Sequence, residues 1–281
     1  MDTTSLGNRQ KRYEQASQTY FTRRVPVIVR CDGNCFSSWT KGLERPFDEN
    51  FRKCMEYATF MLCKEMSGAR LGYTQSDEIT VVLVDYQTYE TEPWFDYKKD
   101  KVISMAATIC SSAFNWACLK YLPEHVKKKG FARFDARAFN IPVDDVVNNF
   151  IWRQRDCEKN SIQSLARSHF SQKQLFKKNT SDMQDMLMLE KGVNWNNVET
   201  KYKRGMAVYK MSQKKIVVNR KTSEEEEVLR SRWFLDYQMP IISKDQDFVN
   251  KKIYPELSCN FLGSDTANVG EVLYAKDVFE I

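Results

Sequence analysis

The order of apolar segments between residues 25 and 141 limits this chain to few folds. Short runs rich in Val and Ile predict strands, and apolar residues three or four positions apart predict helices. The resulting order is strand, helix, strand, strand, helix, strand, which is the split βαβ arrangement of ferredoxin-like domains. We therefore predict an α+β fold. The expected elements are strands at 25–31, 70–75, 79–84 and 131–139, a helix from about Asp48 and a helix at 101–120.

This topology brings acidic residues together. The end of the first strand lies beside the turn of the central hairpin, as in the palm domains of polymerases and cyclases. Asp32 ends the first strand, and Asp77 and Glu78 fall in the predicted turn. We therefore predict a palm-like domain over residues 25–141 with a carboxylate cluster at one end of its sheet.

Less regular sequence lies on both sides of this domain. Residues 1–24 are polar and form an N-terminal extension. Residues 142–281 are expected to form a helical and mixed C-terminal region that packs on the palm. Within this region we predict a helix at 142–170, strands at 205–210 and 216–218, and a helix that opens in the acidic residues 223–226.

Composition excludes several classes of protein. The chain has 281 residues, 42% hydrophobic, with a formal net charge of +6, so it can bury a core and suits an anionic partner. Its 8 cysteines form no CxxC pair and it has 2 histidines, which argues against a zinc finger and for reduced thiols. The sequence shows neither a secretory signal nor an apolar run of membrane-spanning length. We expect a cytoplasmic protein.

The predicted carboxylate cluster suits phosphoryl or nucleotidyl transfer. Such reactions need divalent cations that bridge phosphates, and Asp32, Asp77 and Glu78 supply the acidic ligands. Each motif by itself is more typical of a solvated turn, because Asp-Gly and Asp-Glu are common in turns. Two such turns that converge in one fold favour a functional site. Gly33 adds room for a phosphate or metal to approach the backbone.

Phosphate binding must rely on cationic side chains, because the Walker A pattern is absent from the sequence. Arg45, Lys101 and Arg137 each lie near the edge of a predicted element, and we assign them to a triphosphate clamp.

Six short strings resemble, in order and spacing, the blocks of tRNA-His guanylyltransferases and their relatives. The resemblance covers residues 25–160 well and the remainder loosely. The strings are RCDGNCF (30–36), RPFD (45–48), QSDE (75–78), KVIS (101–104), FDAR (134–137) and WRQRD (152–156).

The resemblance implies functional roles for particular positions. Asp32, Asp77 and the carbonyl of Gly33 match metal ligands, and Glu78 matches a third acidic residue needed for catalysis. The family's lysine before proline is Arg45 here, which keeps the charge but changes the donor geometry. The implied nucleotide-binding set is Asp32, Gly33, Asn34, Cys35, Phe36, Ser37, Arg45, Ser76, Asp77, Lys101 and Arg137. In the polar helix that follows, we assign tRNA binding to Arg153, Arg155, Lys159 and Asn160.

The resemblance also implies a reaction. ATP or GTP activates a 5′-monophosphate on the RNA, and the 3′-hydroxyl of an incoming nucleoside triphosphate then attacks the activated end. Both steps are in-line displacements at phosphorus, for which two Mg²⁺ ions suffice. The relatives are homotetramers, so a homotetramer that binds tRNA and no membrane is expected.

One departure bears on the substrate. Enzymes that add G to histidine tRNA carry a His-Ile-Asn-Asn-Leu-Tyr-Asn-type segment where this chain has Glu-Lys-Asn-Ser-Ile-Gln-Ser at 158–164. This difference favours template-dependent 3′-to-5′ repair of truncated tRNA, with single G addition to histidine tRNA as the alternative.

Two further readings remain open. A nucleotide cyclase would be expected to carry a Gly-Gly-Asp/Glu-Glu-Phe hairpin, which the QSDEI string does not match. A non-catalytic RNA-binding protein is disfavoured because Asp32, Asp77, Glu78 and Lys101 are all present.

Overall fold

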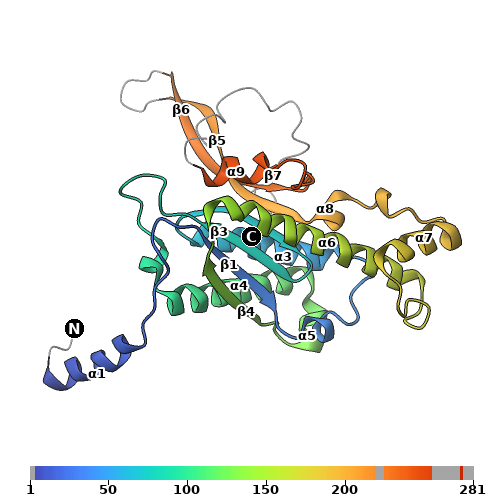
Figure 1. Cartoon of the computed structure of the whole chain (residues 1–281), viewed down its shortest axis with the longest axis horizontal. Coiled ribbons are helices and arrows are strands. Elements are labelled where there is room, and N and C mark those ends of the chain that lie inside the picture. Colours follow the sequence, from blue (N-terminus) through green and yellow to red (C-terminus); the bar gives the residue numbers. More distant parts are fainter. Residues whose placement is uncertain (1–3, 219–224, 255–272, 275–281) are drawn as a thin grey trace.

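The computed structural model describes residues 4–218, 225–254 and 273–274. Among these residues, seven strands form one antiparallel sheet in the order β4-β1-β3-β2-β5-β6-β7 (Figure 1). The strands are β1 (Val27–Gly33), β2 (Ala69–Gln75), β3 (Glu78–Leu83), β4 (Phe134–Asn140), β5 (Met206–Val218), β6 (Glu225–Asp236) and β7 (Leu273–Tyr274).

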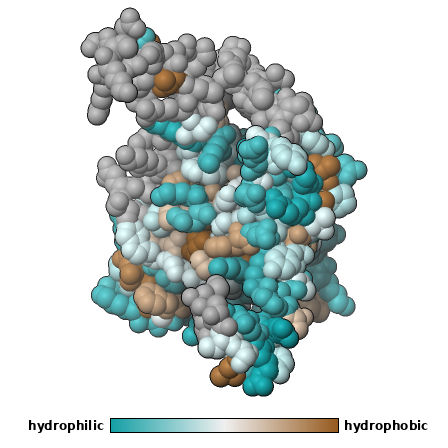
Figure 2. All heavy atoms as spheres, turned by 90° about the vertical axis from the view of Figure 1, so that its left-hand side faces the viewer, coloured by the Kyte–Doolittle hydropathy of each residue, from teal (hydrophilic) through white to brown (hydrophobic). Residues whose placement is uncertain are grey.

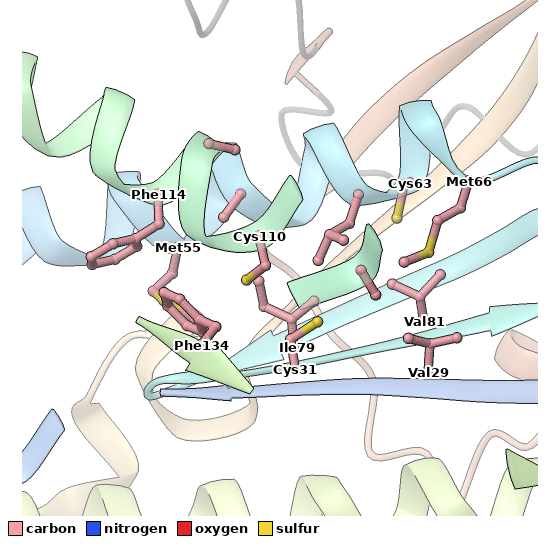
Figure 3. Close-up of a cluster of buried hydrophobic side chains, with 14 of the residues drawn as sticks. Val29, Cys31, Met55, Cys63, Met66, Ile79, Val81, Cys110, Phe114 and Phe134 are labelled. Atoms are coloured by element: carbon pink, nitrogen blue, oxygen red, sulfur yellow. The ribbon is translucent and has the colours of Figure 1, made fainter. Parts of the chain in front are cut away.

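Helices α3 (Glu49–Glu65) and α4 (Lys99–Tyr121) cover one face of the sheet. Asp48 caps α3, accepting a hydrogen bond from the Phe51 amide at 2.8 Å, as the sequence predicts. The contact between helices and sheet is apolar because alternate residues of β1 and β3 point to this side. Figure 3 shows Val29, Cys31, Ile79 and Val81 of the sheet facing Met55, Cys63, Cys110 and Phe114 of the helices.

Helices α6 (Val146–His169) and α9 (Asp247–Ile253) cover the opposite face, and the short helix η2 (Val143–Asp145) leads into α6. Ile28 and Val82, which point away from α3 and α4, pack here with Phe150 of α6. Both faces of the central strands are therefore buried. Residues at the ends of these strands remain accessible to a ligand.

Smaller helices lie around this body. Helix α1 (Ser5–Ala16) has no buried residue and projects from the domain. The side of the molecule that carries it is largely hydrophilic, with small separate hydrophobic patches (Figure 2). The other short helices are α2 (Phe36–Trp39), η1 (Trp94–Tyr97), α5 (Pro123–Lys129), α7 (Thr180–Lys191), η3 (Trp195–Asn197) and α8 (Thr200–Arg204).

The structure confirms the predicted α+β, palm-like order of elements, with boundaries that shift by a few residues. The helix predicted to open at residues 223–226 is wrong in its described part, because Glu225 begins strand β6 and pairs with Val218 of β5. Residues 219–224 lie outside the described residues. The division at residue 141 stays a prediction; β5 of the C-terminal region continues the sheet by pairing with β2.

Helix α4 is long and apolar enough to cross a membrane by length and composition. Val102, Ala106, Cys110 and Phe114 on this helix are fully buried against the sheet and α3. Its apolar side chains thus contribute to the core of the domain.

Candidate active site

The carboxyl end of β1 meets the tip of the β2–β3 hairpin, as the topology predicts. Asp32 is paired in register with Glu78, and the Gly33 amide donates a hydrogen bond to the Asp77 carbonyl at 3.1 Å. Gln75 and Glu78 are paired across the hairpin, so Ser76 and Asp77 form a two-residue turn. Ser76 has a φ of 50°, which a tight turn of this kind requires.

Asp32 and Asp77 repel one another in this arrangement. Burial raises the pKa of Asp77 above its ordinary value, and the charge of Asp32 raises it further. The Ser76 hydroxyl acts in the opposite direction, donating to Asp77 Oδ1 at 3.0 Å. A cation placed between the two carboxylates would relieve this repulsion.

Glu78 does not lie at the hairpin tip, so its predicted position in the turn is wrong. It is the first residue of β3, is 7% exposed, and forms an ion pair with Arg153 of α6 at 2.8 Å. Burial raises the pKa of Glu78, and Arg153 and Arg30 act against that rise. Glu78 is therefore paired within the protein, whereas Asp32 and Asp77 are partly open to solvent.

The segment after β1 turns tightly into α2. At Gly33 a side chain would place its Cβ 2.4 Å from the Phe36 ring, so only glycine fits. Cys35 is in the left-handed conformation with a φ of 58°. Phe36 is buried and packs on Trp39, whereas Asn34, Cys35 and Ser37 are exposed. Phe36 thus shapes this loop from within, and its exposed neighbours are free to meet a ligand.

A pocket of about 480 Å³ opens beside the hairpin tip. Its walls come from the loop before α3, the first turns of α3, the hairpin tip, the second half of α6, and α8. Gln75 lies in its wall, and the Gln75 side-chain oxygen is buried without a hydrogen-bond partner. Of the residues predicted to bind nucleotide, this pocket brings together Ser37, Arg45 and Ser76. Four further residues in its wall were not predicted: Phe47, Arg167, Lys201 and Tyr202.

The C-terminal region closes one side of the pocket through Tyr202. Its ring stacks on Phe47 with centroids 4.5 Å apart and planes 9° apart, and its hydroxyl donates to Glu49 at 2.5 Å. Arg52 also forms an ion pair with Glu49 and donates a hydrogen bond to it from Nε at 2.9 Å. Mainly because of the hydrogen bonding from Arg52, the pKa of Glu49 falls to about 2. Local sequence gives no signal for these contacts, because Tyr202 lies 153 residues from Glu49.

Comparison with known proteins identifies the family. A model of the tRNA-His guanylyltransferase family matches residues 7–142. A solved structure of a bacterial tRNA(His) guanylyltransferase-like protein in complex with ATP is 38% identical, with a TM-score of 0.78 over 89% of this chain and 100% of that one. The chain belongs to the tRNA-His guanylyltransferase family.

Other relatives agree with this assignment. A bacterial tRNA(His) guanylyltransferase-like protein in complex with GTP is 36% identical, with a TM-score of 0.73, and covers 89% of this chain and 100% of its own. The tRNA(His) guanylyltransferase of Saccharomyces cerevisiae is 26% identical over 197 residues, which are 65% of this chain and 81% of the yeast protein. Membership in the tRNA-His guanylyltransferase family makes the chain a nucleotidyltransferase.

The two remaining cations assigned to the triphosphate lie on different elements, one beside Asp32 and one away from it. Arg137 of β4 is half exposed, with Nη2 at 3.7 Å from Asp32 and 3.1 Å from Asp135. Lys101 lies at the start of α4, with Nζ 4.9 Å from the centre of the Phe95 ring. Cys110, which neighbours Cys31, comes nine residues later in α4, so Lys101 lies about 14 Å back along the helix, away from Asp32.

The four residues assigned to tRNA differ in accessibility. Arg155 and Lys159 are exposed on α6, and Asn160 lies in the pocket wall. Arg153 differs from these three, because its side chain points inward, is 6% exposed and is paired with Glu78. The tRNA-His guanylyltransferase motif WRQRD therefore places its first arginine toward the carboxylates.

Proposed function

We propose that this chain adds nucleotides to the 5′ end of tRNA in the 3′-to-5′ direction, repairing truncated tRNA opposite a template. The observation that carries the proposal is the convergence of Asp32 and Asp77 at the tip of a hairpin whose neighbouring residues, Gln75 and Ser76, line a nucleotide-sized pocket. Carboxylates beside a pocket that also holds Arg45 suit the positioning and charge neutralisation that phosphoryl chemistry needs.

The donor set fits magnesium. Among the described residues, no three His, Cys, Asp or Glu side chains gather into a ready-made metal cluster. Mg²⁺ is commonly held by one or two carboxylates together with water and substrate phosphates. Asp32 and Asp77, with the Gly33 carbonyl, would hold two such ions, which would polarise the phosphate and activate the attacking hydroxyl. Glu78 supports this site from its buried position.

The pocket suits an incoming nucleoside triphosphate, ATP or GTP. Two family members are known in complex with these nucleotides. Ser37, Ser76 and Arg45 offer hydroxyl and guanidinium donors around the pocket, and Asn34 and Cys35 lie beside it in the exposed loop. Their part in the reaction is to orient the triphosphate so that its 3′-hydroxyl faces the 5′ end of the RNA.

Repair is favoured over single G addition by helix α6. The segment that begins at Glu158 departs from the sequence expected for G addition, and Glu158 Oε1 lies 4.0 Å from Arg204 Nε of α8. The solved guanylyltransferase-like proteins are 36–38% identical to this chain, against 26% for the yeast guanylyltransferase. Arg155 and Lys159 on the exposed side of α6 are available to tRNA phosphates.

A homotetramer is part of the proposal. Trp116, Leu119 and Phe131 are large apolar side chains with 48%, 52% and 62% exposure on or near α4. Burial of such residues between copies would be favourable. Light scattering coupled to gel filtration measures the mass, and a monomer at micromolar concentration would refute the tetramer.

The direct test of function is a gel assay with Mg²⁺, ATP and all four nucleoside triphosphates. It compares 5′-monophosphorylated tRNA that lacks its first nucleotide with intact histidine tRNA. Templated extension of the truncated tRNA supports repair. A single G added to intact histidine tRNA would support the alternative, and no addition to either RNA would overturn both.

A further inference from the structure

The guanidinium group of Arg153 lies in the interior between α6 and β3. Nη1 is 2.8 Å from Glu78 Oε2 and 3.4 Å from Asp156 Oδ2. Its central carbon lies 3.5 Å from the centre of the Trp152 ring, a stacking distance for a planar cation. The charge of Arg153 is thus committed to partners within the chain.

Glu78 transmits this contact to the carboxylates that face solvent. It follows Asp77 directly in sequence and is the register partner of Asp32 in β1. Its second oxygen, Oε1, accepts a hydrogen bond from Thr80 Oγ1 at 3.4 Å. Holding the Glu78 side chain therefore fixes the first residue of β3, to which the Asp77 turn is attached.

Helix α6 is itself anchored at the next residue. The Gln154 side-chain amide donates to the Pro240 carbonyl at 2.8 Å, and its oxygen accepts from the Ile242 amide at 2.9 Å. Gln154 is 3% exposed. Arg153 therefore projects from a helix that is fixed on its other side, which gives it the rigidity that a positioning residue needs.

Charge balance gives the ion pair a second role. Three carboxylates lie close together here, because Glu78 follows Asp77 in sequence and is the register partner of Asp32. They would repel one another if all were unpaired. Arg153 neutralises Glu78, which leaves Asp32 and Asp77 for cations. Without Arg153, the buried Glu78 charge would lack its partner and compete for the same cation.

We propose that Arg153 is a positioning residue of the nucleotidyl-transfer site: it binds Glu78 and thereby holds the Asp77 turn against Asp32 in the geometry that a divalent cation requires. This role rests on the proposed function and assigns the motif arginine to the protein interior. The competing explanation is a purely structural ion pair, whose loss lowers stability and leaves catalysis intact in the folded fraction.

The chain offers a control in a second ion pair with a buried acid, beyond the other end of strand β3. Arg23 Nε lies 3.6 Å from the fully buried carboxylate of Asp85, so Arg23→Met also takes a guanidinium group from a buried acid. It lies away from Asp32 and Asp77. Urea unfolding of both variants shows how much stability each loses, and rates are compared at temperatures where both are folded.

The experiment measures kcat, nucleotide KM and Mn²⁺ affinity for wild type, Arg153→Met, Arg153→Lys and Arg23→Met. Mn²⁺ binding is followed by electron paramagnetic resonance in the absence of RNA. Arg153→Met is expected to lower kcat about 100-fold and weaken Mn²⁺ binding about tenfold, with KM changed less than about threefold. Arg153→Lys, which keeps one charged donor, should fall between, and Arg23→Met should stay within about twofold of wild type.

A double-mutant comparison tests whether Arg153 acts through Glu78. Glu78→Gln and Arg153→Met break the same pair, so the double variant should be no slower than the slower single variant. Losses that multiply would overturn the proposal. Equal kcat and Mn²⁺ affinity in folded Arg153→Met and wild type would also overturn it.

The two proposals fail separately. If the wild-type protein extends no RNA, the proposed function fails, whereas Mn²⁺ affinity still tests Arg153. Unchanged Mn²⁺ affinity in Arg153→Lys and Arg153→Met would then overturn the positioning role. If Arg153→Met does not fold, Arg153→Lys supplies the same comparison with its charge retained.

Discussion

The two ends of strand β3 hold acidic residues in contrasting surroundings. Beyond its carboxyl end, Asp85 is fully buried, and both of its oxygens accept a hydrogen bond from the Arg24 amide, at 2.8 and 3.0 Å. Before its amino end, Asp77 receives a hydrogen bond from Ser76 and is repelled by Asp32. The charge of Asp85 is therefore compensated by donors within the protein. Asp77 lies beside a like charge, and a cation there would stabilise it.

This contrast separates structural from functional carboxylates. A buried acid with several donors contributes to stability, because its charge is compensated in the folded state. An acid kept beside a like charge costs stability and is retained where a ligand uses it. Glu78 lies between these extremes, since it is close to the functional pair but compensated by Arg153.

The largest expected effect comes from removing charge at the Asp77 end. Asp77→Asn keeps the shape of the turn but removes a metal ligand, so nucleotide addition should fall by about a thousandfold or more. The thermal midpoint should stay the same or rise, because the repulsion with Asp32 is lost. A rate within tenfold of wild type at saturating Mg²⁺ would refute the assignment of Asp77.

The same substitution at the other end should give the reverse result. Asp85→Asn weakens the two hydrogen bonds from the Arg24 amide, and we expect the free energy of unfolding to fall by about 2 kcal/mol. Nucleotide addition by the folded protein should be unchanged. Urea unfolding and the gel assay together make the check, and a large loss of kcat without loss of stability would contradict it.

These two acids also show what the sequence could and could not predict. Runs of Val and Ile identified β1 and β3, and their order placed Asp32 beside Asp77 without any contact information. Glu78 was misplaced because its partner Arg153 lies 75 residues away, and local turn preferences carry no trace of that pair. The acidic residues at the start of β6 favour a helix locally, but pairing with β5 overrides that preference.

The pocket was harder to predict from the sequence than the carboxylate pair. Its walls combine the loop at Arg45 with Arg167 of α6 and Tyr202 of α8. Short motifs identify Asp32 and Asp77 because each lies in a run of a few adjacent residues that can be recognised in the sequence. A pocket wall assembled from distant helices depends on packing, which periodicity alone does not specify.

A smaller effect is expected from the two cations assigned to the triphosphate, Arg137 and Lys101. Arg137→Ala removes a guanidinium group close to Asp32, so the KM for the incoming nucleotide should rise about fivefold. Lys101→Ala should give a smaller rise, because Lys101 lies toward the other end of α4. Steady-state kinetics with varied GTP makes the comparison. An equal rise of KM in both variants would show that Lys101 contributes to nucleotide binding as much as Arg137 does.

The smallest effect concerns Glu49, which contacts Arg52 and Tyr202 of the pocket wall and whose pKa shift is opposite to that of Asp77. Glu49 is ion-paired with Arg52, and its pKa is lowered from 4.5 to about 2. A lowered pKa means that the ionised form stabilises the folded state. This contribution is complete above about pH 4.5 and is lost as the pH falls toward 2.

Glu49→Gln measures that contribution directly. Because Glu49 is 42% exposed, solvent screens the pair, and we expect the free energy of unfolding at pH 7 to fall by about 1 kcal/mol. The difference between wild type and variant should shrink below pH 4.5, since the wild-type carboxylate becomes protonated on unfolding there and its ionised advantage disappears. Urea unfolding at pH 7, 5, 4 and 3 follows this trend. A difference that stays constant across the series would show that Glu49 stabilises the fold through packing against Arg52 and Tyr202, and that the contrast with Asp77 does not lie in its charge.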